Sequence, residues 1–275
     1  MNQKRKRGRC PVKTNQIKWL LMLAVLAVSG FAALNPLLSP SHPAQSYMTS
    51  DVLLLDPGHG GIDGGAVSLS GTCEKDINLA IALQVKSMAE ADGWEVLLTR
   101  ESDKGLYTGV KKDGTENAEI ENGRSIRSLK TEDLKARKEL LGKINPRAAV
   151  SIHLNSFRED RSVHGSQTFY PSSSSDPNIS RESRKLAECI QSKLEQGIPD
   201  GRTREAMGKS DVLILKDPPA PIVIVECGFL SNEKEAKLLQ QEDYQKSLAE
   251  CIYRGIMTYT GKKPRPSLFI TDSRG

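Results

Sequence analysis

Two histidines and two glutamates have the side-chain chemistry of a metal-dependent hydrolase. They are His59, Glu74, His153 and Glu226, spread over much of the chain. Two imidazoles and one carboxylate form a common catalytic zinc site, which leaves one position open for water. A further carboxylate beside such a site can act as a general base. The residue types therefore indicate a zinc hydrolase, without saying which glutamate binds the metal.

Three of these residues lie where apolar segments that read as buried strands come to an end. They are His59 after 52–55, His153 at the end of 148–153, and Glu226 at the end of 222–226. Glu74 lies on the loop that opens a predicted helix. Because ligands of open α/β sheets gather at the carboxyl ends of strands, these four positions can converge on one point.

Each residue also has a structural interpretation. His153 could be a hydrogen-bonded core histidine, and Glu226 could belong to a structural ion pair, because an unpaired buried carboxylate is costly. Glu74, next to Lys75, also fits a solvated residue of a first helical turn, where the helix dipole favours an acid. His59 lies among glycines, which offer no apolar surface for a core imidazole. His164 has no strand-end setting and is expected at the surface.

The glycine-rich segment 58–65 also raises the possibility of a phosphate-binding loop. It lacks the Lys-Ser/Thr ending of such a loop, and Asp63 occupies the third glycine position of a dinucleotide fingerprint. The segment is therefore weak evidence for a nucleotide site.

Strand and helix patterns alternate from residue 51 onwards, which predicts one α/β domain. The predicted strands cover 52–55, 95–99, 148–153, 163–170, 212–215 and 222–226. The predicted helices cover 76–92, 131–144, 178–196, 232–239 and 244–259. Residues 103–128 and 197–208 lack periodicity and are expected to be loops. We therefore expect a mostly parallel central sheet of about six strands, flanked by helices.

The N-terminal residues are predicted to be a targeting region. Residues 1–34 combine seven Lys or Arg residues with an uncharged apolar run from Trp19 to Leu34, which fits a signal peptide or a membrane anchor. Residues 35–50 are rich in Pro and Ser and fit a linker. The catalytic domain is then expected at 51–261, with a flexible tail at 262–275. The positive flank predicts export of the domain, either released or associated with the membrane through its N-terminus.

Charge and cysteine usage exclude two other classes of function. The net charge of +5 comes from the basic leader, and aromatic residues make up only 5% of the chain, so no nucleic-acid partner is expected. Four cysteines lie in the predicted domain without the spacing of a zinc ribbon, namely Cys73, Cys189, Cys227 and Cys251. They are expected to be small buried hydrophobes, with any disulfide pairing left open.

Several segments resemble the zinc-dependent N-acetylmuramoyl-L-alanine amidases of the type 3 family. They are Asp-Pro-Gly-His-Gly-Gly-x-Asp-Gly-Gly-Ala at 56–66, Glu-Lys-Asp-x-Asn-Leu at 74–79, Thr-Arg at 99–100, Ser-Ile-His-Leu-Asn at 151–155 and Val-Glu-x-Gly-Phe-Leu-Ser-Asn at 225–232. The resemblance extends from about residue 52 to 260. It implies a single α/β domain with a six-stranded sheet. It also implies one Zn²⁺ per chain bound by His59, Glu74 and His153, with Glu226 as the catalytic residue.

Within that family the chain is most similar to the amidases of sporulation and germination. This similarity implies hydrolysis of the amide between N-acetylmuramic acid and L-alanine in spore-cortex peptidoglycan. A muramic-acid deacetylase would be the functional partner that then helps form muramic δ-lactam. The location would be outside the cytoplasm, such as the forespore intermembrane space. The alternatives are a general vegetative or division amidase, another zinc amidohydrolase, and a non-catalytic cell-wall-binding module.

Overall fold

The structure is a computed structural model, which describes residues 50–108, 110–112, 118–120, 124–198 and 204–265. The predicted leader and nearly all of the predicted linker lie outside the described residues, as do residues 266–275 of the predicted tail. Among the helices of the described residues, none has the length and apolar character needed to cross a membrane.

A six-stranded sheet forms the centre of the described structure, in the order β2-β1-β5-β8-β6-β7. Its strands are β1 (Val52–Pro57), β2 (Glu95–Leu98), β5 (Ala148–Asn155), β6 (Gln167–Pro171), β7 (Met207–Lys209) and β8 (Ile222–Phe229). The strands β1, β2, β5 and β8 are parallel, whereas β6 is antiparallel to β8 and parallel to β7. The prediction of a single α/β domain with a mostly parallel sheet is confirmed.

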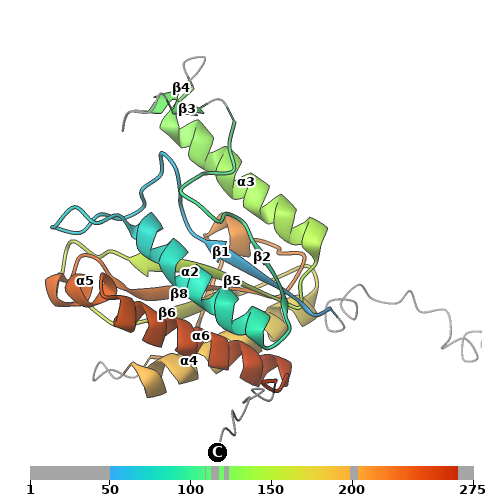
Figure 1. Cartoon of the computed structure of the whole chain (residues 1–275). Coiled ribbons are helices and arrows are strands. Elements are labelled where there is room, and N and C mark those ends of the chain that lie inside the picture. The colour runs from blue at the N-terminus through green and yellow to red at the C-terminus, as the bar shows by residue number, and fades with distance from the viewer. Residues whose placement is uncertain (1–49, 109, 113–117, 121–123, 199–203, 266–275) are drawn as a thin grey trace, which may run out of the picture. The chain divides into compact units, whose positions relative to one another are not determined.

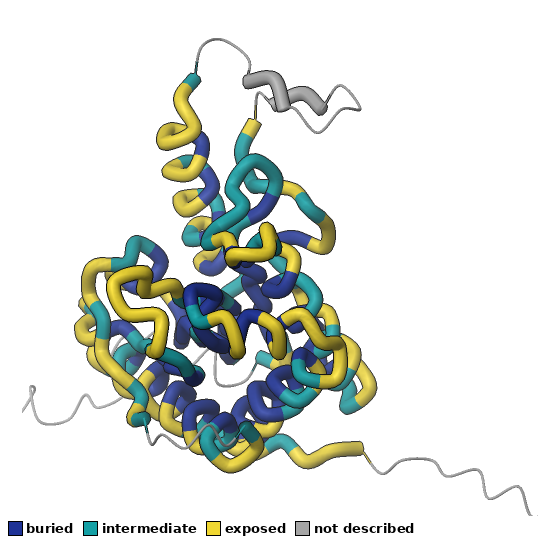
Figure 2. Tube along the Cα trace, turned by 90° about the vertical axis from the view of Figure 1, so that its left-hand side faces the viewer, coloured by how far each residue is buried: buried dark blue, intermediate teal, exposed yellow. Residues whose placement is uncertain are grey.

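Helices cover both faces of this sheet (Figure 1). The helices α2 (Glu74–Ala91), α4 (Pro177–Gly197) and α6 (Glu242–Thr260) pack over one face and bury the larger apolar core. The short helix α5 (Glu233–Leu239) adds to the same core. The helix α3 (Ile126–Ile144) and the 3₁₀ helix η4 (Leu213–Leu215) cover a smaller apolar core on the other face. Figure 2 shows buried positions in the interior and exposed positions on the outer turns of the helices.

The apolar run of β1 follows from burial on both faces. Leu53 and Leu55 belong to the larger core, whereas Leu54 between them belongs to the smaller one. Successive side chains of a strand point to opposite faces, so a strand covered on both sides needs an unbroken apolar sequence. This is why β1, β5 and β8 each begin with an unbroken apolar run, at 52–55, 148–150 and 222–225.

Two sequence predictions between residues 197 and 215 are wrong. Residues 212–215 were expected to be a strand, but Leu213–Leu215 form η4, whose Ile214 and Leu215 pack into the smaller core. The expected loop 197–208 overlaps the edge strand β7. A run of four apolar residues fits either state, and β7 is only three residues long, so neither has a clear sequence signal.

Two element boundaries also differ from the prediction. The expected strand 163–170 begins only at Gln167, after Gly165 adopts a positive φ of 96°. The expected loop 103–128 contains an antiparallel pair of short strands, β3 (Val110–Lys112) and β4 (Ala118–Ile120). It also contains the first turn of α3, whose N-terminus is capped by the Ser125 hydroxyl.

The contact between α3 and the sheet includes a buried ion pair. Arg137 of α3 is 2% exposed, and its Nη1 lies 2.6 Å from Oδ1 of Asp56 in β1. The same guanidinium binds Asp133 one turn earlier, with 2.5 Å between Nε and Oδ2. Burial would raise the pKa of Asp56, but Arg137 and hydrogen bonds from Ser151 and Thr99 outweigh it and lower this pKa to about 2. Asp56 is therefore ionised at neutral pH, as its charge pairing requires.

We expect Arg137→Ala to destabilise the domain strongly. The substitution leaves two buried carboxylates without their counter-charge, and breaking a buried ion pair in this way costs about 3–5 kcal/mol. The free energy of unfolding can be measured by urea denaturation of the two proteins. Lys135→Ala, on the exposed side of the same helix, is the matched control and should change stability by less than about 0.5 kcal/mol. Equal effects of the two substitutions would contradict this account of the ion pair.

Candidate metal centre

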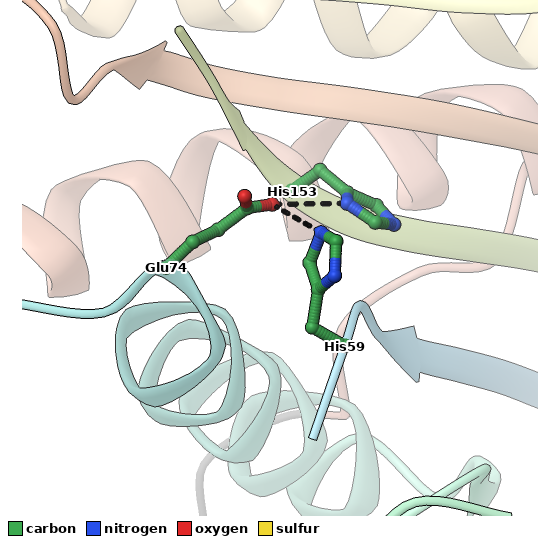
Figure 3. A group of neighbouring side chains, drawn as sticks. All are labelled: His59, Glu74 and His153. Carbon is green, nitrogen blue, oxygen red and sulfur yellow. Dashed lines mark hydrogen bonds and ion pairs between the residues drawn. The ribbon is translucent and has the colours of Figure 1, made fainter. Parts of the chain in front are cut away.

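Three elements bring His59, Glu74 and His153 together (Figure 3). His59 follows β1 and has a left-handed backbone, with φ at 62°. Glu74 is the first residue of α2, and His153 lies in β5. One ligand atom from each of the three residues lies within 4.8 Å of the others. The structure therefore gathers three of the four residues singled out in the sequence into one cluster.

The Glu74 carboxylate lies between the two imidazoles. Its Oε1 is 3.2 Å from Nε2 of His59 and 3.0 Å from Nδ1 of His153. The two rings meet nearly edge to face, with centroids 5.0 Å apart. Two ligands of one tetrahedral zinc ion, with bonds of about 2.0–2.1 Å, are separated by roughly 3.3 Å. The donor set and its spacing therefore fit a zinc ion.

Glu74 is a buried carboxylate and not a solvated residue of a first helical turn. It is 3% exposed, and its oxygens accept hydrogen bonds from the main-chain N–H groups of Leu154 and Ala66 and from Nδ2 of Asn78. Burial would raise the pKa of Glu74, but its hydrogen bonds with the two histidines outweigh burial and lower it. The hydrogen bonds with the histidines hold the carboxylate ionised, which is the form that a metal requires.

Asp63 orients the ring of His59. Its Oδ2 is 2.8 Å from Nδ1 of His59, and its Oδ1 is 2.6 Å from Nζ of Lys130 in α3. A carboxylate that accepts the Nδ1 proton fixes the ring so that Nε2 faces Glu74, and Nε2 would bind a metal after losing its own proton. Burial opposes the charged imidazolium, but Asp63 and Glu74 together raise the pKa of His59 to about 9.

Two glycines make room for the cluster. A Cβ on Gly58 would lie 2.2 Å from Cε1 of His153. A Cβ on Gly65, which has a φ of 70°, would lie 2.6 Å from Oε2 of Glu74 and 2.7 Å from Cδ2 of His59. These glycines are required by the close approach of the backbone to the three side chains.

Two buried arginines hold the loop that carries His59. Arg100 donates from Nε to the carbonyl of Pro57 and from Nη2 to that of Gly58, both at 2.9 Å. Arg137 donates from Nη1 to the carbonyl of Pro57 at 2.8 Å and from Nη2 to that of His59 at 2.6 Å. Three consecutive carbonyl groups are thereby bound by guanidinium groups, which fixes the path of the loop.

Glu226, the fourth residue singled out in the sequence, lies on the adjacent strand. It is paired in register with His153 between β8 and β5. Its Oε2 is buried without a hydrogen-bond partner, and burial raises the pKa of its carboxyl. A raised pKa suits a group that must accept a proton and later return it near neutral pH.

The remaining sequence candidates lie outside this cluster. The ring of His164 bonds the carbonyl of Ser162 through Nδ1. The cysteines of the predicted domain form no disulfide, and Cys227 and Cys251 are buried as expected, whereas Cys73 and Cys189 are only partly so. None of the four joins the three residues of the cluster in the described structure.

No role for Asp63 or for the two arginines follows from the sequence alone. Asp63 lies four residues after the candidate ligand His59, and this spacing could have indicated that its carboxylate binds the imidazole. Arg100 belongs to one of the segments that carry the family resemblance, Thr-Arg at 99–100. Nothing in the sequence, however, connects Arg137 with residues 57–59. That connection exists only because α3 packs on β1.

Known proteins are similar to this chain over most of its length. Residues 53–258 match the model of the N-acetylmuramoyl-L-alanine amidase family, type Amidase_3. The germination-specific N-acetylmuramoyl-L-alanine amidase of Bacillus subtilis is 35% identical over 80% of this chain and 84% of that protein. The amidase AmiC of Neisseria meningitidis is 30% identical over 76% of this chain, which spans about half (52%) of AmiC.

A solved structure shows a similar fold. It is the CwlD amidase of Clostridioides difficile in complex with the GerS lipoprotein, which has 43% sequence identity to this chain and a TM-score of 0.67. The match covers 77% of this chain and 99% of that one. The chain belongs to the type 3 N-acetylmuramoyl-L-alanine amidases, enzymes of cell-wall peptidoglycan, and within that family it is similar to CwlD.

Proposed function

We propose that this enzyme uses one zinc ion, held by His59, Glu74 and His153, to hydrolyse the amide between N-acetylmuramic acid and L-alanine. The observation that carries the proposal is the position of the Glu74 carboxylate, 3.0 and 3.2 Å from nitrogens of the two imidazoles. Family membership supports the identity of the bond that is cleaved. A non-catalytic wall-binding module would have no need of such a donor set.

The chemistry divides between the metal and the protein. When bound, zinc supplies a Lewis acid that polarises the amide carbonyl and lowers the pKa of a water molecule. The protein contributes two imidazoles of fixed orientation and one ionised carboxylate. Asp63 holds His59 in the required tautomer, and the main-chain N–H groups of Leu154 and Ala66 hold Glu74 in place.

Glu226 is the proposed general base and acid. Its carboxyl lies next to His153 across the β5–β8 pair, and it has one oxygen without a protein partner. In this role it takes a proton from the attacking water and delivers it to the alanine nitrogen as the amide bond breaks. The buried setting of Glu226 favours the protonated state that exists between these two steps.

The first test joins metal content to product identity. The purified full chain should contain about one zinc per molecule and should release new N-terminal alanine from isolated peptidoglycan while the glycan strands stay intact. Treatment with a chelator should abolish the release, and added zinc should restore it. Zinc without this product would contradict the proposed substrate, whereas absence of both would contradict the metal centre itself.

Glu226→Gln should separate catalysis from metal binding. The substitution keeps the size of the side chain but removes its proton-accepting carboxylate, so kcat should fall by at least about 10²-fold. Zinc content should remain at the wild-type level. Glu233→Gln, an exposed glutamate at the start of α5, is the matched control and should retain full activity. Near-normal turnover by the Glu226 variant would exclude the role assigned to this residue.

For the biological role, we propose maturation of the spore cortex. The named function of the B. subtilis relative, germination-specific amidase, and the similarity to CwlD support this choice over a vegetative or division amidase. The enzyme would act outside the cytoplasm, in the forespore intermembrane space, secreted or anchored by its N-terminus. A muramic-acid deacetylase would act next on the exposed muramic acid to form the δ-lactam.

Deletion of the gene should remove muramic δ-lactam from the spore cortex while leaving vegetative growth and cell separation unchanged. Cortex muropeptides of wild-type and deletion spores can be compared by chromatography and mass spectrometry. Complementation with the wild-type gene should restore the lactam, and the Glu226→Gln gene should not. Defective separation of vegetative cells with a normal cortex would favour the vegetative or division role instead.

A further inference from the structure

A guanidinium group is hydrogen-bonded to the residue that lies opposite Glu226 in the sheet. Gln167 of β6 is paired directly with Glu226 of β8. Opposite residues of antiparallel strands have their side chains on the same face, with Cβ atoms about 4.5–5.5 Å apart. Nη1 of Arg204 donates to Oε1 of Gln167 at 3.3 Å. Arg204 thus binds the residue that faces the proposed base across the β6–β8 pair.

Neutral groups hold the Arg204 side chain in place. Its Nη2 donates to the carbonyl of His164 at 2.6 Å, and its Cζ lies 5.6 Å from the centre of the Phe229 ring. Gln167 and Phe229 are each 5% exposed, so both are firmly packed, while Arg204 itself is partly exposed. The guanidinium is therefore positioned before any ligand arrives.

The charge of Arg204 is not paired with a carboxylate in the described structure. Glu195 binds the main-chain N–H of Arg204 and not its guanidinium, and the side chain of the neighbouring Glu205 is exposed. Nε of Arg204 is buried without an acceptor. A second cation, Lys209 of β7, lies on the same side, with its Nζ 4.8 Å from the centre of the Phe169 ring. A prepositioned arginine without a counter-ion is suited to bind a carboxylate of a ligand.

We infer that Arg204, supported by Gln167, is a specificity-determining residue that binds a carboxylate of the stem peptide next to the scissile amide. The inference rests on the proposed function. In peptidoglycan the residue after L-alanine is a γ-linked D-glutamate, whose α-carboxyl is either free or amidated. That group lies roughly 7 Å from the alanine nitrogen. Gln167 lies opposite Glu226, the residue proposed to protonate that nitrogen, and Arg204 is hydrogen-bonded to Gln167.

The test uses two muramoyl tripeptides that differ only in whether the α-carboxyl of D-glutamate is free or amidated. With the zinc-loaded full chain, kcat/KM should be about tenfold or more higher for the free acid, because hydrogen bonds to charged groups are the stronger ones. Arg204→Gln should bring the two substrates to within about twofold of each other, mainly through loss of activity on the acid. Arg204→Lys should keep part of the preference for the free acid, since lysine retains the positive charge but lacks the planar N–H donors that bind a carboxylate at both oxygens.

Controls separate recognition from folding and from the proposed chemistry. Zinc content and melting temperature of each variant should match the wild type, and Arg254→Gln, on the exposed side of α6, should leave the preference unchanged. Equal kcat/KM of the wild type for both substrates would overturn the inference while leaving the amidase intact. An equal loss on both substrates in Arg204→Gln would also overturn it, because it would indicate a structural role. If the wild type cleaved neither substrate, the proposed function would fail first.

Discussion

The candidate metal centre depends on the binding of three consecutive carbonyl groups, those of Pro57, Gly58 and His59, by the buried side chains of Arg100 and Arg137. Carbonyl groups that follow the end of a strand inside a protein have no neighbouring strand to bind. Burying them without a hydrogen-bond donor costs free energy. A guanidinium offers five N–H donors in one plane, enough to satisfy several of them at once. The buried positive charge of Arg137 is balanced by Asp56 of β1 and Asp133 of α3. As a result, the docking of α3 and the position of the first histidine form one structural unit.

The two glutamates of the site have opposite environments, and these suit them to different tasks. Glu74 receives main-chain and side-chain hydrogen bonds on both oxygens and lies against both histidines, which favours its ionised form. Glu226 is desolvated, and one of its oxygens has no partner, which favours the protonated form. Two carboxyl groups whose pKa values are displaced in opposite directions are typical of sites that need one constant charge and one proton carrier.

The two faces of the sheet have different compositions along the strands. On the face toward α3, β5 presents Ala149 and then His153, and β8 presents Ile224 and then Glu226, so this face changes from apolar to polar toward the carboxyl ends. The opposite face stays apolar almost throughout, and α2, α4 and α6 bury it. A single rigid core therefore supports strand ends whose polar side chains all lie on one side. The site is built on strands and one helix start, which limits the movement of its side chains.

The sequence by itself determined the class of fold, most of the element positions and the four residues proposed for the chemistry. Buried parallel strands require long apolar runs, so a polar residue at the end of such a run is conspicuous without any structure. Local sequence patterns could not identify every feature. The elements η4 and β7 are too short for a periodic signal, and Glu74 alone fitted a solvated helix start equally well. Only the tertiary structure decided what surrounds these residues. The contacts from Arg137 to His59 and from Arg204 to Gln167 join segments 78 and 37 residues apart. Such contacts arise when segments distant in the sequence pack together in space, and no local pattern of residues records them.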